Sequence, residues 1–83
     1  MFFVYAIKSE KDGRIYVGLT NDLERRILEH NQGKTKSTKG YVPWVLVYRE
    51  TVDTMEIARK REKYLKSGIG KKIIKEYILH KAS

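Results

Sequence analysis

A short hairpin near the N-terminus, FVYAIKSEKDGRIYVG, constrains the fold of this chain more than any other stretch. Residues 2–8 and 14–19 are rich in β-branched and aromatic side chains, which favour strands. The polar segment between them ends in an Asp-Gly pair, which is typical of tight hairpin turns. Because side chains alternate along a strand, an even loop length places Tyr5 and Tyr16 on one face. Two phenols on one face, as a functional pair or as packed sheet tyrosines, are therefore the first expectation.

The length and composition of the chain bound its class. Eighty-three residues, 41% of them hydrophobic, suffice for one domain with its own core, so we expect a single domain over residues 1–83. The absence of cysteine excludes a disulfide scaffold and a thiolate metal site, and it fits a reducing cytosol. The apolar run over residues 1–7 is too short for a signal peptide or a membrane span. We therefore expect a cytoplasmic protein with no membrane partner.

The charge of the chain indicates a polyanionic partner. Eighteen Lys and Arg residues oppose ten Asp and Glu residues, which gives a net charge of +8. A domain this basic most often binds nucleic acid. A solvated, lysine-rich surface without such a partner is the plainer interpretation of the same composition.

The first helix is expected over residues 22–32, with Asn21 as its N-cap. The inner arc of its helical wheel holds Leu23, Ile27 and His30. Arg26 borders this arc, and it neighbours the histidine because the two are four residues apart. Arg25 and Glu29 are expected to face water. A partly buried polar residue on a helix border is the ordinary alternative for a lone histidine.

A loop and a third strand follow the first helix. The loop over residues 33–41 is rich in hydroxyl groups and lysines, which suits phosphate contact or an exposed loop equally; its lysines are Lys34, Lys36 and Lys39. Residues 42–49 are expected to form the strand, with Pro43 at its start, where a missing N–H costs least. Trp44 and Tyr48 on this strand are expected in the core or on the sheet surface rather than as base-stacking platforms.

Glu62 is the sharpest anomaly in the chain. A second capping signal predicts a helix over residues 54–66, whose apolar stripe contains Met55, Ala58 and Leu65. Glu62 falls within that stripe, whereas basic residues are expected on the opposite side: Arg59, Lys60, Lys63 and Lys66. A carboxylate among apolar neighbours is costly unless it is paired or holds a cation. Two interpretations are open, an ion pair, for example with Arg26, and a metal site.

The remaining residues complete the expected fold. A terminal helix over residues 70–80 presents isoleucines and Tyr77 on one side and lysines on the other, as a cover for the sheet would. The element order is therefore ββαβαα, an α+β fold in which a three-stranded antiparallel sheet is flanked by helices.

The motifs, taken together, resemble those of the GIY-YIG nuclease domain over nearly the whole chain. FVY at residues 3–5 and YVG at residues 16–18 stand in place of the two strand motifs. DLERRILEHN at residues 22–31 is similar to the arginine helix of the family, and ARKREKYLK at residues 58–66 is similar to the helix that carries a metal-binding glutamate. The chain is most similar to the small, stand-alone bacterial members and less similar to the UvrC repair nuclease and intron homing endonucleases.

The resemblance implies a role for each candidate residue. Glu62 would be the sole protein carboxylate on one divalent ion, Mg²⁺ or Mn²⁺, which would bind weakly without DNA. Arg26 would contact the scissile phosphate, and Tyr16 would hydrogen-bond in the same pocket. Tyr5 would be the general base for the attacking water, or would orient that water. As a base it needs nearby cations to lower its pKa, and Arg26 and the metal are the expected ones. His30 would assist proton transfer or hold a tyrosine in place.

Function follows from the same resemblance. We expect a metal-dependent DNA endonuclease, structure-directed or weakly specific and linked to repair or recombination, with DNA contacts from Lys34, Lys36, Lys39, Arg59, Lys63 and Lys66. Two departures matter: Phe3 replaces the first glycine, and no asparagine occurs after Asn31, where the family often has one. Phe3 is typical of the stand-alone members, whereas the missing asparagine and the absence of a DNA-targeting domain favour the alternative of a non-catalytic DNA- or RNA-binding module. A subunit whose specificity comes from a protein partner is a third interpretation.

Overall fold

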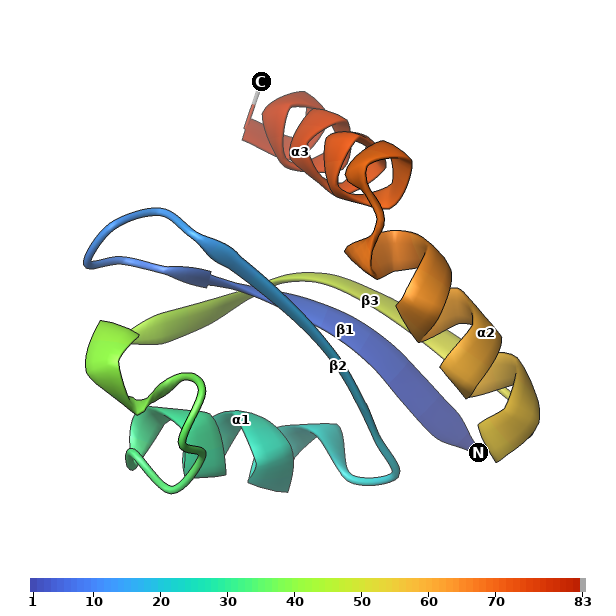
Figure 1. Cartoon of the computed structure of the whole chain (residues 1–83), viewed down its shortest axis with the longest axis horizontal. Coiled ribbons are helices and arrows are strands. Elements are labelled where there is room, and N and C mark those ends of the chain that lie inside the picture. Colours follow the sequence, from blue (N-terminus) through green and yellow to red (C-terminus); the bar gives the residue numbers. More distant parts are fainter. Residues whose placement is uncertain (83) are drawn as a thin grey trace.

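Three antiparallel strands in the order β2-β1-β3 form the centre of the computed structural model, which describes residues 1–82 (Figure 1). Position 83 of the expected domain lies outside the described residues. The elements are β1 (Phe2–Ser9), β2 (Ile15–Thr20), α1 (Leu23–Asn31), the 3₁₀ turn η1 (Lys39–Tyr41), β3 (Trp44–Val52), α2 (Met55–Lys66) and α3 (Gly68–Ala82). The expected α+β class and ββαβαα order are confirmed, although β3 begins and ends later than expected and α3 begins earlier.

Helices cover both faces of this sheet, as Figure 1 shows, with α1 on one side and α2 and α3 on the other. Alternate residues of β1 point into the two layers: Val4 and Ala6 pack with α2 and α3, whereas Tyr5 and Ile7 pack on the side of α1. In the β1–β2 register, Tyr5 is opposite Gly18 and Ile7 is opposite Tyr16. The two tyrosines therefore lie on one face, as the alternation predicts.

The helix starts are set by side-chain caps. The carboxylate of Asp22 accepts a hydrogen bond from the backbone N–H of Arg25 at 3.2 Å, so Asp22 caps α1. The expectation that Asn21 is the cap is wrong by one residue, because both side chains can accept this bond and only the backbone geometry chooses between them. Thr54 caps α2 through the N–H of Ile57.

Asn31 fastens the end of α1 to the start of β3. Its side-chain amide donates to the carbonyl of Trp44 at 3.0 Å and accepts from the N–H of Trp44 at 2.6 Å. Trp44 is 3% exposed, which confirms its predicted place in the core. Tyr48, also on β3, is half-buried and packs edge-on against Tyr77 of α3. β3 is thereby tied to α1 and to α3.

No helix within residues 1–82 combines the length and the apolar character that crossing a lipid bilayer requires.

The junction of α2 and α3 is close-packed around Gly70. This glycine is buried, and a Cβ atom at its position would overlap the backbone of Tyr64 and Leu65. The turn between the helices uses Ser67, whose hydroxyl accepts from the N–H of Gly70 at 3.2 Å. A side chain at residue 70 would force the two helices apart.

Replacing Gly70 with alanine should therefore destabilise the fold, with a loss of about 1–3 kcal/mol in the free energy of unfolding because backbone atoms cannot move aside as side chains can. Gly68→Ala is the matched control in the same helix, since a Cβ there meets no atom within 4 Å. Chemical denaturation measures both. Equal midpoints for the two variants would contradict the packing described.

Candidate active site

Tyr5 and His30 form the buried centre of the candidate site. Tyr5 is 1% exposed, and its hydroxyl oxygen lies 2.8 Å from Nε2 of His30, which is fully buried. The phenol extends across β2 at Gly18, where a Cβ atom would stand 2.6 Å from the hydroxyl oxygen. Gly18 thus makes room for the phenol, a packing role that the spacing of the motifs does not indicate.

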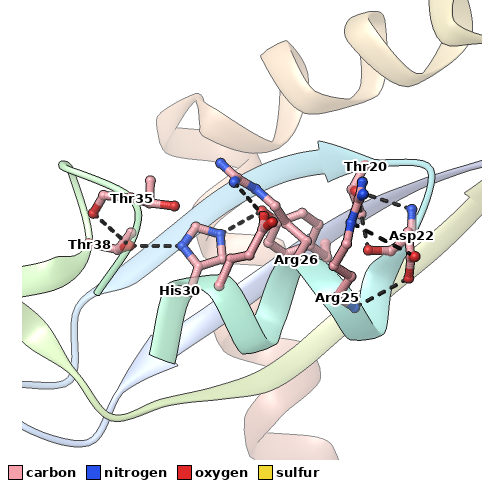
Figure 2. A network of polar contacts seen from close by, with 9 residues as sticks. Thr20, Asp22, Arg25, Arg26, His30, Thr35 and Thr38 are labelled. Carbon is pink, nitrogen blue, oxygen red and sulfur yellow. Dashed lines mark hydrogen bonds and ion pairs between the residues drawn. The ribbon is translucent and has the colours of Figure 1, made fainter. Parts of the chain in front are cut away.

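The other ring nitrogen of His30 contacts a residue that sequence reasoning missed. Nδ1 of His30 is 2.8 Å from Oγ1 of Thr38, and this oxygen is 3.4 Å from the carbonyl oxygen of Thr35 (Figure 2). Thr38 is 1% exposed. The loop over residues 33–41 was expected to direct hydroxyl groups at phosphate or solvent, and for Thr38 that expectation is wrong. Its hydroxyl faces inward and extends the buried network.

Burial moves both central groups toward their neutral forms. It lowers the pKa of His30 to about 4, aided by the nearby charge of Arg26, so the imidazole is neutral at pH 7. Burial also raises the pKa of Tyr5 to about 12, and the guanidinium of Arg26 offsets this only in part. Arg26 lowers the pKa of Tyr5 as expected, but desolvation outweighs it, so the net shift is upward.

Arg26 projects from the same side of α1 as His30 (Figure 2). Its Nη1 atom lies 3.1 Å from Oε1 of Glu29, and both side chains are about one-third exposed. Glu29 was expected to face water; instead it holds the guanidinium from one turn further along the helix. Arg25 is 63% exposed and lies 3.9 Å from the capping carboxylate of Asp22. The predicted difference between the two arginines is confirmed.

Glu62 approaches the site from the opposite layer, since α2 packs on the other face of the sheet. Its side chain is 24% exposed and lies 3.4 Å from Nζ of Lys66. The expected alternative partner, Arg26, pairs with Glu29 instead, and Lys66 does not lie opposite Glu62 because the two are four residues apart. The charge of Glu62 contributes to raising the pKa of Tyr5. This contribution is the smallest of those that act on the phenol.

Tyr16 completes the group on the α1 side of the sheet. Its ring centroid is 5.2 Å from that of His30 and 6.4 Å from that of Trp44, and both contacts are edge-on. β2 is an edge strand of the sheet, so one of its sides is free of strand pairing. The structure therefore gathers Tyr5, Tyr16, Arg26 and His30 in one layer, whereas Glu62 belongs to α2 on the other face of the sheet.

The predicted nucleic-acid contacts are all on the surface: Lys34, Lys36, Lys39, Arg59, Lys63 and Lys66 are exposed. Three of them lie in the loop after α1 and three on α2. A cavity of about 400 Å³ lies elsewhere, between residues 46–49 of β3 and the side chains of Tyr77, Ile78 and Lys81 on α3. It contains none of the candidate residues.

The donor set at Glu62 fits a weakly held divalent ion. Within residues 1–82, no three His, Asp or Glu side chains are grouped so that they could hold a metal. A single half-buried carboxylate can still serve Mg²⁺, which keeps several of its waters and takes further oxygen ligands from substrate phosphate. The residues present are therefore compatible with one ion that binds together with a polyanion.

Comparison with known proteins identifies relatives over most of the chain. The family described as the GIY-YIG catalytic domain matches residues 1–75. A UPF0213 protein of Staphylococcus saprophyticus is 42% identical over 88% of this chain and 89% of its own length. Another, of Clostridium perfringens, is 45% identical over 80% of this chain and 71% of its own length. Both matches cover more than two thirds of this chain and of the relative.

A solved structure shares the fold. The solution NMR structure of a UPF0213 protein of Bacillus halodurans superimposes with a TM-score of 0.56 at 34% sequence identity, covering 92% of this chain and 84% of that protein. The three-stranded sheet with its flanking helices is therefore the fold of this group of proteins.

The buried, neutral His30 should make stability depend on pH. Its pKa of about 4 in the folded chain lies below the ordinary value of 6.5, so the unfolded chain takes up the proton first as the pH falls. The stabilisation is fully present above pH 6.5 and is lost toward pH 4, with a slope of at most about 1.4 kcal/mol per pH unit.

Chemical denaturation of the wild type and of His30→Gln between pH 7 and pH 5 measures the contribution of His30 to the free energy of unfolding. The free energy of unfolding should fall more steeply in the wild type, because glutamine does not titrate. Parallel curves would show that His30 is not buried in its neutral form.

Proposed function

Because the chain belongs to the GIY-YIG catalytic domain family, we propose that it is a DNA endonuclease that hydrolyses phosphodiester bonds with the help of one divalent metal ion. The observation that carries the proposal is the buried hydrogen bond between Tyr5 and His30, placed beside Arg26 and within the electrostatic reach of Glu62. Phosphodiester hydrolysis needs an activated water, charge neutralisation at phosphorus and a stabilised leaving oxygen. Each of these needs has a candidate among the four side chains.

Tyr5 and His30 supply the proton acceptor. A phenol with a pKa of about 12 is almost entirely protonated at pH 7, so Tyr5 is not a phenolate before the reaction begins. When Tyr5 donates its own proton to Nε2 of His30, its oxygen keeps lone pairs that can accept a proton from water. The pair therefore works as a unit, with Tyr5 next to the water and His30 behind it. Tyr16 orients this pocket through its contact with the His30 ring.

Arg26 and Glu62 supply charge. Arg26 is preorganised by Glu29 and presents its remaining N–H groups to a phosphate, where a guanidinium is most effective. Glu62 would hold one Mg²⁺ or Mn²⁺ ion, which when bound supplies positive charge to the phosphate and to the leaving oxygen. Lys66 lies next to Glu62, so it offsets the carboxylate while no metal is present.

DNA is the proposed partner, and the exposed basic residues of the loop after α1 and of α2 are its proposed contacts. Such contacts are made to phosphate and carry no sequence information, so we expect structure-directed or weakly specific cleavage, in DNA repair or recombination. A protein partner that adds specificity and a cytoplasmic location belong to the same proposal.

A non-catalytic DNA- or RNA-binding module is the second candidate. Two observations favour it: the raised pKa of Tyr5 and the lack of any asparagine after Asn31. Such a module would keep the fold and the basic surface while it cleaves nothing.

Cleavage of supercoiled plasmid and of branched DNA with Mg²⁺, Mn²⁺ or EDTA distinguishes the two candidates. The wild type should nick in a metal-dependent way, and Glu62→Gln and Arg26→Ala should each lower the rate by about 10²-fold or more, since each removes a charge that acts on the transition state. Glu76→Gln and Arg25→Ala, at exposed positions, are the controls and should cleave at rates close to the wild type.

Binding measured in parallel completes this test. The nuclease proposal requires Glu62→Gln to bind DNA as well as the wild type does while it fails to cleave. If no protein cleaves under any metal condition, yet all bind with the same salt dependence, the binding module is the correct assignment.

Metal affinity in the absence of DNA should respond to Lys66. Since its ammonium group competes for the Glu62 carboxylate, Lys66→Met should tighten Mn²⁺ binding severalfold, measured by titration of the free ion with electron paramagnetic resonance. Lys63→Met removes the same charge from an exposed position that forms no ion pair with Glu62 and should have a smaller effect. Equal affinities in the two variants would place the ion away from Glu62.

A further inference from the structure

A buried chain of hydrogen bonds runs from the sheet through α1 into the following loop. It links the Tyr5 hydroxyl to Nε2 of His30 at 2.8 Å, Nδ1 of His30 to the Thr38 hydroxyl at 2.8 Å, and this hydroxyl to the Thr35 carbonyl at 3.4 Å. Figure 2 shows Thr38 and Thr35 on the loop side of the imidazole. Each hydroxyl has one proton and a neutral imidazole has one, so the direction of every bond in the chain depends on the others.

The surroundings of Tyr5 determine which atom donates in the hydrogen bond between Tyr5 and His30. The Tyr5 hydroxyl is buried, and a buried donor needs an acceptor. Its neighbour Arg26 offers only donors, whereas Nε2 of His30 is an acceptor in one of the two tautomers. Tyr5 therefore donates to Nε2, and the single proton of the imidazole is on Nδ1.

The hydrogen bonds on the loop side of His30 are consistent with a proton on Nδ1. Nδ1–H of His30 donates to the oxygen of Thr38, and Thr38 has an acceptor for its own proton in the carbonyl of Thr35. In the reverse arrangement, Thr38 would donate to Nδ1 and Nε2–H would donate to the Tyr5 oxygen. The proton of Tyr5 would then face the guanidinium of Arg26, which cannot accept it. Only in the first arrangement does every N–H and O–H of Tyr5, His30 and Thr38 have an acceptor.

Thr38 is held in place by the core. Its carbonyl oxygen accepts from Nε1 of the buried Trp44 at 2.9 Å and from the N–H of Tyr41 at 3.1 Å. Its own N–H donates to the carbonyl of Thr35 at 3.1 Å. The hydroxyl therefore meets the imidazole from a fixed direction rather than from a loose loop.

We propose that Thr38 is a positioning residue that fixes the Nδ1–H tautomer of His30, so that Nε2 is free to take the proton of Tyr5. The mechanistic part rests on the proposed nuclease function. As the oxygen of the attacking water bonds to phosphorus, one O–H bond of the water breaks and its proton passes to the Tyr5 oxygen. The original Tyr5 proton moves to Nε2, and His30 becomes an imidazolium whose Nδ1–H still donates to Thr38. The bond from phosphorus to the leaving oxygen breaks, and its electron pair goes to that oxygen. The Nε2 proton returns to the Tyr5 oxygen, and the proton taken from water passes to solvent or to the leaving oxygen.

Nitrogen-15 NMR of the imidazole tests the tautomer without reference to cleavage. The chain has two histidines, so the spectrum of His30→Gln assigns the signals of His30. In the wild type at pH 7, we expect a protonated Nδ1 and an unprotonated Nε2. Thr38→Val removes the hydroxyl at nearly constant shape and should shift the population toward the Nε2–H tautomer, whereas Thr38→Ser should keep the wild-type signals.

Thr35→Val is the matched control, because it removes a loop hydroxyl while it leaves the carbonyl that Thr38 uses. The Oγ1 atom of Thr35 has no hydrogen-bond partner within residues 1–82. Its loss should leave the tautomer unchanged. An Nε2–H tautomer in the wild type would overturn the proposal, and so would equal spectra for Thr38→Val and Thr35→Val. If Thr38→Val does not fold, the wild type and Thr38→Ser decide the question.

Cleavage assays separate this proposal from the function on which it rests. Thr38→Val should lower kcat by at least about tenfold at an unchanged KM for DNA, within the range that general acid–base catalysis contributes, and Thr38→Ser should restore it. An unchanged kcat in Thr38→Val would refute the positioning role. An Nδ1–H tautomer in a wild type that cleaves nothing would refute the nuclease assignment, while the tautomer assignment would stand.

Discussion

The burial of one neutral imidazole between a phenol and a loop hydroxyl organises this small domain. His30 fills the space between the sheet and the loop after α1, and its two nitrogens reach Tyr5 on one side and Thr38 on the other. An unsatisfied polar group in such a position would cost about 1–3 kcal/mol, so both partners contribute to the stability of the fold. The same burial keeps the phenol and the imidazole uncharged at pH 7.

The free edge of β2 is the second constraint. Tyr5 reaches this edge only because Gly18 has no side chain, and Glu62 reaches the phenol electrostatically from the layer on the other side of the sheet. The carboxylate and the guanidinium of Arg26 each have an internal partner, Lys66 and Glu29. Both charged groups are therefore paired within the protein, so a phosphate at Arg26 or a metal ion at Glu62 would have to compete with these internal partners.

Periodicity predicts those parts of this structure in which neighbours in sequence are neighbours in space. Alternation along the strands places Tyr5 and Tyr16 on one face, and the helical period separates Arg26 from Arg25. The contact of Glu62 with Lys66 follows the same period and could have been predicted from their spacing of four. Thr38 could not, because loop hydroxyls look alike in sequence and only the tertiary path of the loop turns one of them inward. The raised pKa of Tyr5 likewise depends on how deeply it is buried, which no local pattern reports.

A structure of the protein with Mn²⁺ and a short DNA duplex tests the central claim most directly. It should place a phosphate between the guanidinium of Arg26 and the ion at Glu62, with a water in hydrogen-bond contact with the Tyr5 hydroxyl. DNA bound across β3 and α3, with Tyr5 and His30 sealed from the phosphate, would contradict the account. The buried pair would then be part of the core and not of a catalytic site.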